Sequence, residues 1–137
     1  MLELAGHERI VAVKDCGGSL DKTLALIADG RLRVLCGEDL EMFGALCAGG
    51  SGAIAASAHV RPERFVAMER LLREGRLADA RAIWHTLVPL VRAMFAEPNP
   101  GPVKAALART GLIRNELRGP MTVVSDGLAR ELAELVE

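Results

Sequence analysis

The first sixty residues alternate short apolar runs with segments of helical spacing. The apolar runs are too short for helices and predict strands, and residues that start or stop helices bound the segments between them. The expected strands are 9–13, 32–35 and 52–56, and the expected helices are 19–28 and 38–48. Because strands that alternate with helices run parallel to one another, this pattern predicts a parallel β/α array.

After residue 60 only helical spacing remains. Pro62 suits the first position of a helix, and apolar residues then recur on one helical face. A second helix is expected from Ile83 to Met94, with a kink where Pro89 removes one amide donor. Two more are expected, one beginning at Pro102 and one capped by Ser125. The second part of the chain is therefore predicted to be helical.

The predicted sheet is too small to close. Three parallel strands leave unpaired backbone groups on both outer edges, and near-continuous apolar strands are typical of a sheet covered on both faces. The sequence therefore predicts an α/β fold that is part of a barrel. Exposed edges and apolar helix faces of this kind also favour association with another chain.

Composition narrows the classes of function. Half of the residues are hydrophobic, 26% are charged and the net charge is -1, with one Trp, no Tyr and three Phe. A nucleic-acid-binding module would need basic clusters and stacking side chains, and no apolar run reaches the length of a membrane span. Cys16, Cys36 and Cys47 have the spacing of neither a zinc site nor a disulfide framework, which favours a reducing compartment and a cytoplasmic protein.

Lys14 is the first candidate for chemistry. It follows the apolar run 10–13 and precedes the turn 15–19, so it is expected at the carboxyl end of a buried strand. In barrels and open α/β sheets this end faces the active site. A lone lysine at a strand end is more often solvated or ion-paired, so the local pattern leaves both interpretations open.

The other polar residues give weaker indications of a functional site. The adjacent Glu38 and Asp39 could form an acid/base pair, but the start of a helix favours carboxylates that complement the helix dipole. The separations between His7, His59 and His85 do not suggest metal ligands. No metal site is therefore expected.

Five segments in order carry a resemblance to a known family. They are IVAVKDCGGS at 10–19, LCGED at 35–39, GGSGAIAASAHV at 49–60, EPNPGPVK at 97–104 and LRGPMT at 117–122. Together they resemble the C-terminal half of 4-hydroxy-tetrahydrodipicolinate synthase (dihydrodipicolinate synthase), a member of the Schiff-base lyase and aldolase superfamily. The resemblance implies that residues 1–60 form strands 6–8 of a (β/α)8 TIM barrel. Residues 61–137 would form the last barrel helix and a C-terminal helical subdomain.

The resemblance also implies the site and the reaction. Full-length members condense pyruvate with aspartate semialdehyde in lysine and diaminopimelate biosynthesis, through a lysine Schiff base and without a cofactor or metal. Lys14 matches the Schiff-base lysine, the main chain of Ile54 matches a wall of the pyruvate pocket, and Gly37 matches a glycine that leaves room beside the lysine. The local pattern alone would make Ile54 a core residue and Gly37 part of a turn.

The family's glycine-rich motif for the pyruvate carboxylate and its tyrosine proton relay belong to the N-terminal half, and this chain has no Tyr. We therefore expect a truncated family member that needs a complementary half-barrel, or associates with itself, and that has little activity alone. Two alternatives stay open. One is a non-catalytic half-barrel or remnant, and the other is a fragment of a related lyase of the N-acetylneuraminate or keto-deoxy sugar acid aldolase type.

Overall fold

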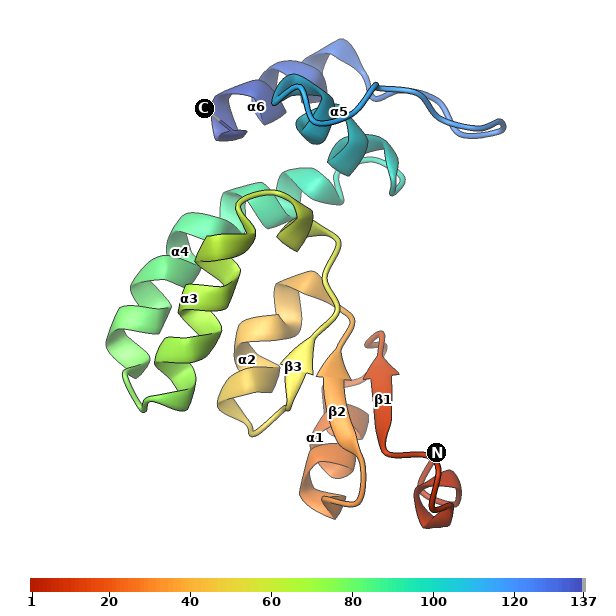
Figure 1. The fold of residues 1–137 in the computed structure, drawn as a ribbon, viewed down its shortest axis with the longest axis vertical. Helices are drawn as coiled ribbons and strands as arrows, with labels where there is room; N and C mark the ends of the chain where they lie inside the picture. The colour runs from red at the N-terminus through yellow and green to blue at the C-terminus, as the bar shows by residue number, and fades with distance from the viewer. Residues whose placement is uncertain (137) are drawn as a thin grey trace.

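A three-stranded parallel sheet forms the N-terminal part of the computed structural model, which describes residues 1–136 (Figure 1). Its strands are β1 (Ala12–Asp15), β2 (Arg33–Cys36) and β3 (Gly52–Ala53), in the spatial order β1-β2-β3. In register, Lys14 lies beside Leu35, and Leu35 lies beside Gly52. The predicted parallel β/α array is confirmed, and each outer strand has one neighbour among the described residues.

Helices cover one face of the sheet and form the rest of the chain. The sheet helices are α1 (Leu20–Asp29) and α2 (Met42–Cys47), which lie on the same side of the strands (Figure 1). The long antiparallel pair is α3 (Pro62–Arg73) and α4 (Leu77–Met94), and the tail contains α5 (Gly101–Arg109) and α6 (Asp126–Val136). Short 3-10 helices are η1 (Leu4–Gly6), η2 (Asp39–Glu41) and η3 (Ser57–His59).

The predicted helix starts are confirmed where a local cap determines them. The Ser19 hydroxyl accepts a hydrogen bond from the backbone N–H of Lys22 at 3.3 Å, and Pro62 is the first residue of α3. The Ser125 hydroxyl accepts from the backbone N–H of Leu128 at 3.3 Å, at the start of α6. At the other end of α1, Gly30 adopts a left-handed φ of 74° that ends the helix.

The first strand lies further along the chain than predicted. It was expected at 9–13 and spans Ala12–Asp15, because its pairing with β2 fixes it. Arg33 N–H donates to the Val11 carbonyl at 3.0 Å, and Gly37 N–H donates to the Asp15 carbonyl at 2.7 Å. Lys14 is therefore a residue of the strand itself, one position before its end.

The region around Asp39 corrects two further predictions. The helix expected at 38–48 is divided into η2 and the shorter α2, and the strand expected at 52–56 ends at Ala53. The Asp39 carboxylate accepts hydrogen bonds from the amides of Ala56 at 3.3 Å and Ser57 at 2.7 Å, which draws this backbone away from the ladder. Glu38 precedes η2 and Asp39 lies in its first turn, as a dipole-complementing role requires, although neither side chain makes a capping hydrogen bond.

Two apolar clusters form the core, and α4 contributes to both. The first joins β2, α2, α3 and α4 from Ala80 to Val91, and includes Met68, Trp84 and Leu87. The Trp84 ring stacks on Phe43 of α2, with ring centroids 5.8 Å apart. The second joins the end of α4, beyond Pro89, to α5 and α6. The helix runs on through Pro89.

The predicted division of the chain at residue 60 stays a prediction, and residue 137 of its second part lies outside the described residues. In Figure 1, α5 and α6 pack at the far end of α4, away from the sheet. None of the helices between residues 1 and 136 is long and apolar enough to cross a membrane.

Candidate active site

The register of the strands separates the sheet into a covered face and an open face. Residues paired across parallel strands point to the same side, and successive residues alternate between the two sides. The side chains of Asp15, Val34 and Cys36 point toward the helices and are 2%, 2% and 4% exposed. Lys14 belongs to the opposite face, is exposed, and is covered by no described helix. A closed barrel would have this face as its interior.

Gly37 lies directly against the Lys14 side chain. A Cβ atom added at Gly37 would lie 2.6 Å from Lys14 Cε and 2.8 Å from Cys16 Sγ, closer than such atoms can approach. The lysine side chain therefore crosses the space that the missing side chain leaves free. Cys16 is two residues beyond Lys14 and shares this space, which sequence reasoning had not identified.

Ile54 follows β3 and continues its pairing, since its N–H donates to the Cys36 carbonyl at 2.8 Å. Its side chain is 48% exposed, so Ile54 is not the core residue that the local pattern alone favours. The structure thus brings Lys14 and Gly37 into contact and places Ile54 at the end of the outer strand. Contacts of Ile54 and Gly37 with pyruvate stay predictions.

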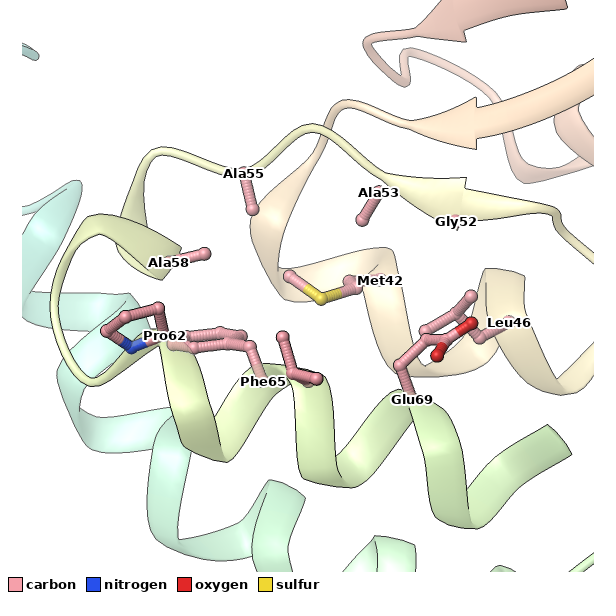
Figure 2. Close-up of a pocket in the computed structure, with 10 residues that line it drawn as sticks. Met42, Leu46, Gly52, Ala53, Ala55, Ala58, Pro62, Phe65 and Glu69 are labelled. Atoms are coloured by element: carbon pink, nitrogen blue, oxygen red, sulfur yellow. The ribbon is translucent and has the colours of Figure 1, made fainter. Parts of the chain in front are cut away.

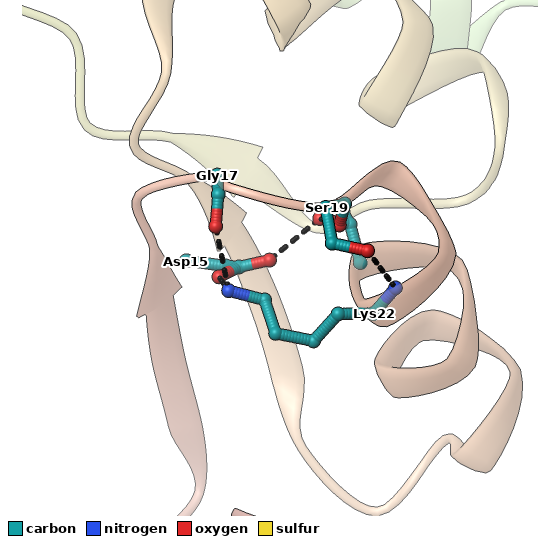
Figure 3. A network of polar contacts seen from close by, with 5 residues as sticks. Asp15, Gly17, Ser19 and Lys22 are labelled. Carbon is teal, nitrogen blue, oxygen red and sulfur yellow. Dashed lines mark hydrogen bonds and ion pairs between the residues drawn. The ribbon is translucent and has the colours of Figure 1, made fainter.

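A buried polar network holds the turn that follows Lys14 (Figure 3). The Asp15 carboxylate accepts a hydrogen bond from Thr23 Oγ1 at 2.6 Å and forms an ion pair with Lys22 Nζ at 2.6 Å. Lys22 Nζ also donates to the Gly17 carbonyl at 2.7 Å. Gly17 has a φ of 76°, a left-handed conformation that suits glycine. The network therefore joins the end of β1, the turn and α1.

Two opposing effects act on the Asp15 carboxyl. Burial raises the pKa of Asp15, but the hydrogen bonds from Lys22 and Thr23 and the charge of Lys22 outweigh burial, so the pKa lies below its ordinary value. The carboxylate is therefore bound in its charged form. Lys22 Nζ therefore binds Asp15 and Gly17 on the helix-covered side of the sheet. Lys14 is the lysine of the open face.

This network makes stability depend on pH. Because the pKa of Asp15 is depressed in the folded chain, the unfolded chain binds more protons below about pH 4, and the stabilisation is lost as the pH falls through the folded pKa. We expect Asp15→Asn to lower the free energy of unfolding by about 1–2 kcal/mol at pH 7, since Lys22 is partly solvated. It should also flatten the acid dependence. Urea unfolding at pH 7 and in acid measures both effects.

The exposed Asp79→Asn variant is the matched control and should leave both quantities nearly unchanged. Equal losses in the two variants, or an acid dependence that survives Asp15→Asn unaltered, would contradict this account of the network.

Asp39 organises the other end of the site. Its carboxylate is 2% exposed and fastens the amides of Ala56 and Ser57, so the end of β2 is tied to the loop that follows Ile54. Within residues 1–136, no three His, Cys, Asp or Glu side chains gather as ligands for a metal ion. The open face thus presents the amine of Lys14, the thiol of Cys16 and the backbone of Gly37.

Comparison of the whole chain with models of known protein families identifies its family. Residues 1–137 match the model of the dihydrodipicolinate synthetase family. The chain belongs to this family. This membership confirms the resemblance that the five sequence segments indicated.

Curated relatives are about twice as long as the chain. The 4-hydroxy-tetrahydrodipicolinate synthase of Hyphomonas neptunium is 44% identical over 123 residues, which are 87% of this chain and 42% of the relative. That of Gluconobacter oxydans is 41% identical over 123 residues, 88% of this chain and 41% of the relative. The chain therefore spans less than half of the length of the relatives it matches, and corresponds to their C-terminal part.

Solved structures agree with this placement. The dihydrodipicolinate synthase of Aquifex aeolicus is 30% identical, with a TM-score of 0.93 over 98% of this chain and 47% of that one. That of Thermotoga maritima is 32% identical, with a TM-score of 0.91 over 96% of this chain and 46% of that one. The expected fold class is thereby confirmed: the sheet is part of a (β/α)8 barrel, followed by C-terminal helices.

Proposed function

We propose that this chain supplies the Schiff-base lysine of a 4-hydroxy-tetrahydrodipicolinate synthase, and that Lys14 is that lysine. The observation that carries the proposal is the position of Lys14. Its side chain lies on the open face of the sheet, against Gly37, in a chain of this family. A related synthase from Acinetobacter baumannii, 27% identical with a TM-score of 0.91, has been solved in complex with pyruvate.

The proposed chemistry requires a neutral amine. The Lys14 nitrogen attacks the ketone carbon of pyruvate, and loss of water leaves an iminium that withdraws electrons from the neighbouring methyl group. Removal of a methyl proton gives an enamine, whose carbon forms the new bond to the aldehyde of aspartate semialdehyde. Gly37 gives the lysine room to reach the ketone, and the main chain at Ile54 lines the same space.

Turnover is proposed to need a complementary half-barrel. Lys14 is exposed to water, and closing the barrel would shield its side chain from water. The chain also has no Tyr that could relay protons.

We propose the cytoplasm as the compartment, where unpaired thiols such as those of Cys16, Cys36 and Cys47 stay reduced.

Trapping the imine tests this function directly. The full chain is mixed with the N-terminal part of the Hyphomonas neptunium relative, then with pyruvate and borohydride, and analysed by intact mass and peptide mapping. The chain has three lysines, Lys14, Lys22 and Lys104, so assignment is simple. We expect one reduced pyruvate on Lys14, lost in Lys14→Ala and retained in Lys104→Ala.

An adduct on another lysine would contradict the proposal. The absence of any adduct, although the two halves associate, would also contradict it and would favour a non-catalytic half-barrel. If the adduct forms, aspartate semialdehyde is compared with sugar-acid aldehydes as the second substrate. Faster turnover of the sugar-acid substrates would instead indicate a lyase of the N-acetylneuraminate or keto-deoxy sugar acid type.

A further inference from the structure

The groove beside β3, on the helix-covered side of the sheet, is apolar (Figure 2). It has a volume of about 320 Å³ and lies between β3, α2 and α3. Of the residues that line it only Glu69 is charged, and Glu69 is paired with Arg73. Ala53 and Ala55 point into this groove, and side chains alternate along a strand, so Ile54 points to the opposite face. A carboxylate such as that of pyruvate therefore fits the open face of the sheet and not this groove.

Two nucleophilic side chains meet on the open face. A Cβ atom added at Gly37 would lie 2.6 Å from Lys14 Cε and 2.8 Å from Cys16 Sγ, so these two atoms are no further apart than the two distances together. Residues two apart along a strand point to the same side, and the Cys16 side chain is exposed. Within residues 1–136, neither the Lys14 amine nor the Cys16 thiol has a hydrogen-bond or ion-pair partner. Both groups are therefore available for reaction.

The imine proposed for Lys14 would form within reach of this thiol. Its carbon is bonded to Nζ, and Nζ is bonded to Cε, the atom that already lies close to Cys16 Sγ. Rotation about the flexible end of the lysine side chain is enough to bring this carbon to the sulfur. Cysteine sulfur is intrinsically very nucleophilic, and two groups held in one small space react at a high effective concentration. Addition of the sulfur to the imine carbon is therefore expected.

We propose that Cys16 adds to the Lys14–pyruvate iminium and holds it as a covalent N,S-acetal, which rests on the proposed function in requiring that imine. The sulfur forms a bond to the iminium carbon, the electron pair of the C=N π bond returns to nitrogen, and the thiol proton leaves to water. The step is reversible and consumes no oxidant or reductant. The product has no C=N bond, so it no longer draws electrons from the methyl group and cannot give the enamine. Cys16 thereby keeps bound pyruvate in a form that does not react with the aldehyde.

Carbon-13 NMR with pyruvate labelled at the ketone carbon tests this proposal. The full chain is mixed with the N-terminal part of the Hyphomonas neptunium relative and with the labelled pyruvate, and the bound label is observed. In the wild type we expect the signal of a tetrahedral carbon bonded to nitrogen and sulfur. This signal should be lost in Lys14→Ala and in Cys16→Ala. It should be retained in Cys47→Ala, the matched control, because the Cys47 thiol is also exposed but lies at the end of α2.

Borohydride trapping gives a second measurement, because borohydride reduces the imine and leaves the N,S-acetal unreduced. We expect Cys16→Ala and Cys16→Ser to give at least about threefold more Lys14 adduct than the wild type at short reaction times. Cys16→Ser keeps the size of the side chain and replaces the thiol by a weaker nucleophile. Prolonged treatment should bring the yields together, since the addition is reversible. Circular dichroism checks that all variants keep their helices.

The two proposals fail separately. An adduct on Lys14 that forms at the same rate with and without the Cys16 thiol, with no tetrahedral carbon signal, keeps the function and overturns the role of Cys16. A tetrahedral signal that survives in Cys16→Ala also overturns this role, because water rather than sulfur would then have added to the imine carbon. An adduct in neither the wild type nor Cys16→Ala overturns both proposals, since no imine then forms.

Discussion

Replacing Gly37 with alanine is expected to lower the yield of the Lys14–pyruvate adduct at least about tenfold, while changing the stability of the chain little. The added Cβ would lie 2.6 Å from Lys14 Cε, so the lysine must move from its present path. That atom is near the end of a flexible side chain, so the fold can accommodate the change. The amine, however, leaves the position from which it would reach the ketone.

Gly44→Ala is the matched control, because nothing lies within 4 Å of a Cβ built at that position. Both variants are mixed with the N-terminal half, and borohydride-trapped adduct and urea unfolding are measured for each. A Gly37→Ala chain with an unchanged adduct yield would show that the room beside the lysine is not needed. A large loss of stability would show instead that Gly37 is needed for the stability of the fold.

Trp84→Ala is expected to lower the free energy of unfolding by about 3–5 kcal/mol, a large part of the stability of a small domain. Trp84 is 8% exposed and stacks on Phe43, so its ring fastens α4 to the helix that covers the sheet. Removing it leaves a cavity in the first core cluster. Urea unfolding followed by circular dichroism measures the change, since the variant lacks the only Trp.

Leu77→Ala, on the same helix but 47% exposed, should cost less than about 1 kcal/mol. Comparable losses in the two variants would mean that the stacked pair does not hold the helices to the sheet.

Local signals in the sequence predicted the helix starts well. Ser19, Pro62 and Ser125 act through atoms within a few residues, so the sequence around each of them determines its role. The predicted strand limits were less accurate, because the limits of a strand depend on pairing across the sheet. β1 is shifted toward Lys14 by hydrogen bonds to residues about twenty positions away, which no local pattern reveals.

The candidate site shows the same limit. Asp39 was interpreted only from its place at a helix start, which gave no sign of its bonds to Ala56 and Ser57, 17 and 18 residues away. Lys14 was a candidate from its place at a strand end, but the five matched segments were needed to assign a role to Lys14 and to single out Gly37. The resemblance implied that Gly37 lies beside Lys14, and the register of β1 and β2 explains physically why the two are neighbours.

The shared helix α4 has a consequence for folding. Leu87 and Val91 belong to the cluster against the sheet side, whereas Leu90 and Met94 belong to the cluster of the tail. Neither cluster can lose its packing without releasing a helix on which the other depends. The barrel portion and the C-terminal helices are therefore expected to unfold as one cooperative unit, so that a destabilising substitution in the tail also destabilises the strands.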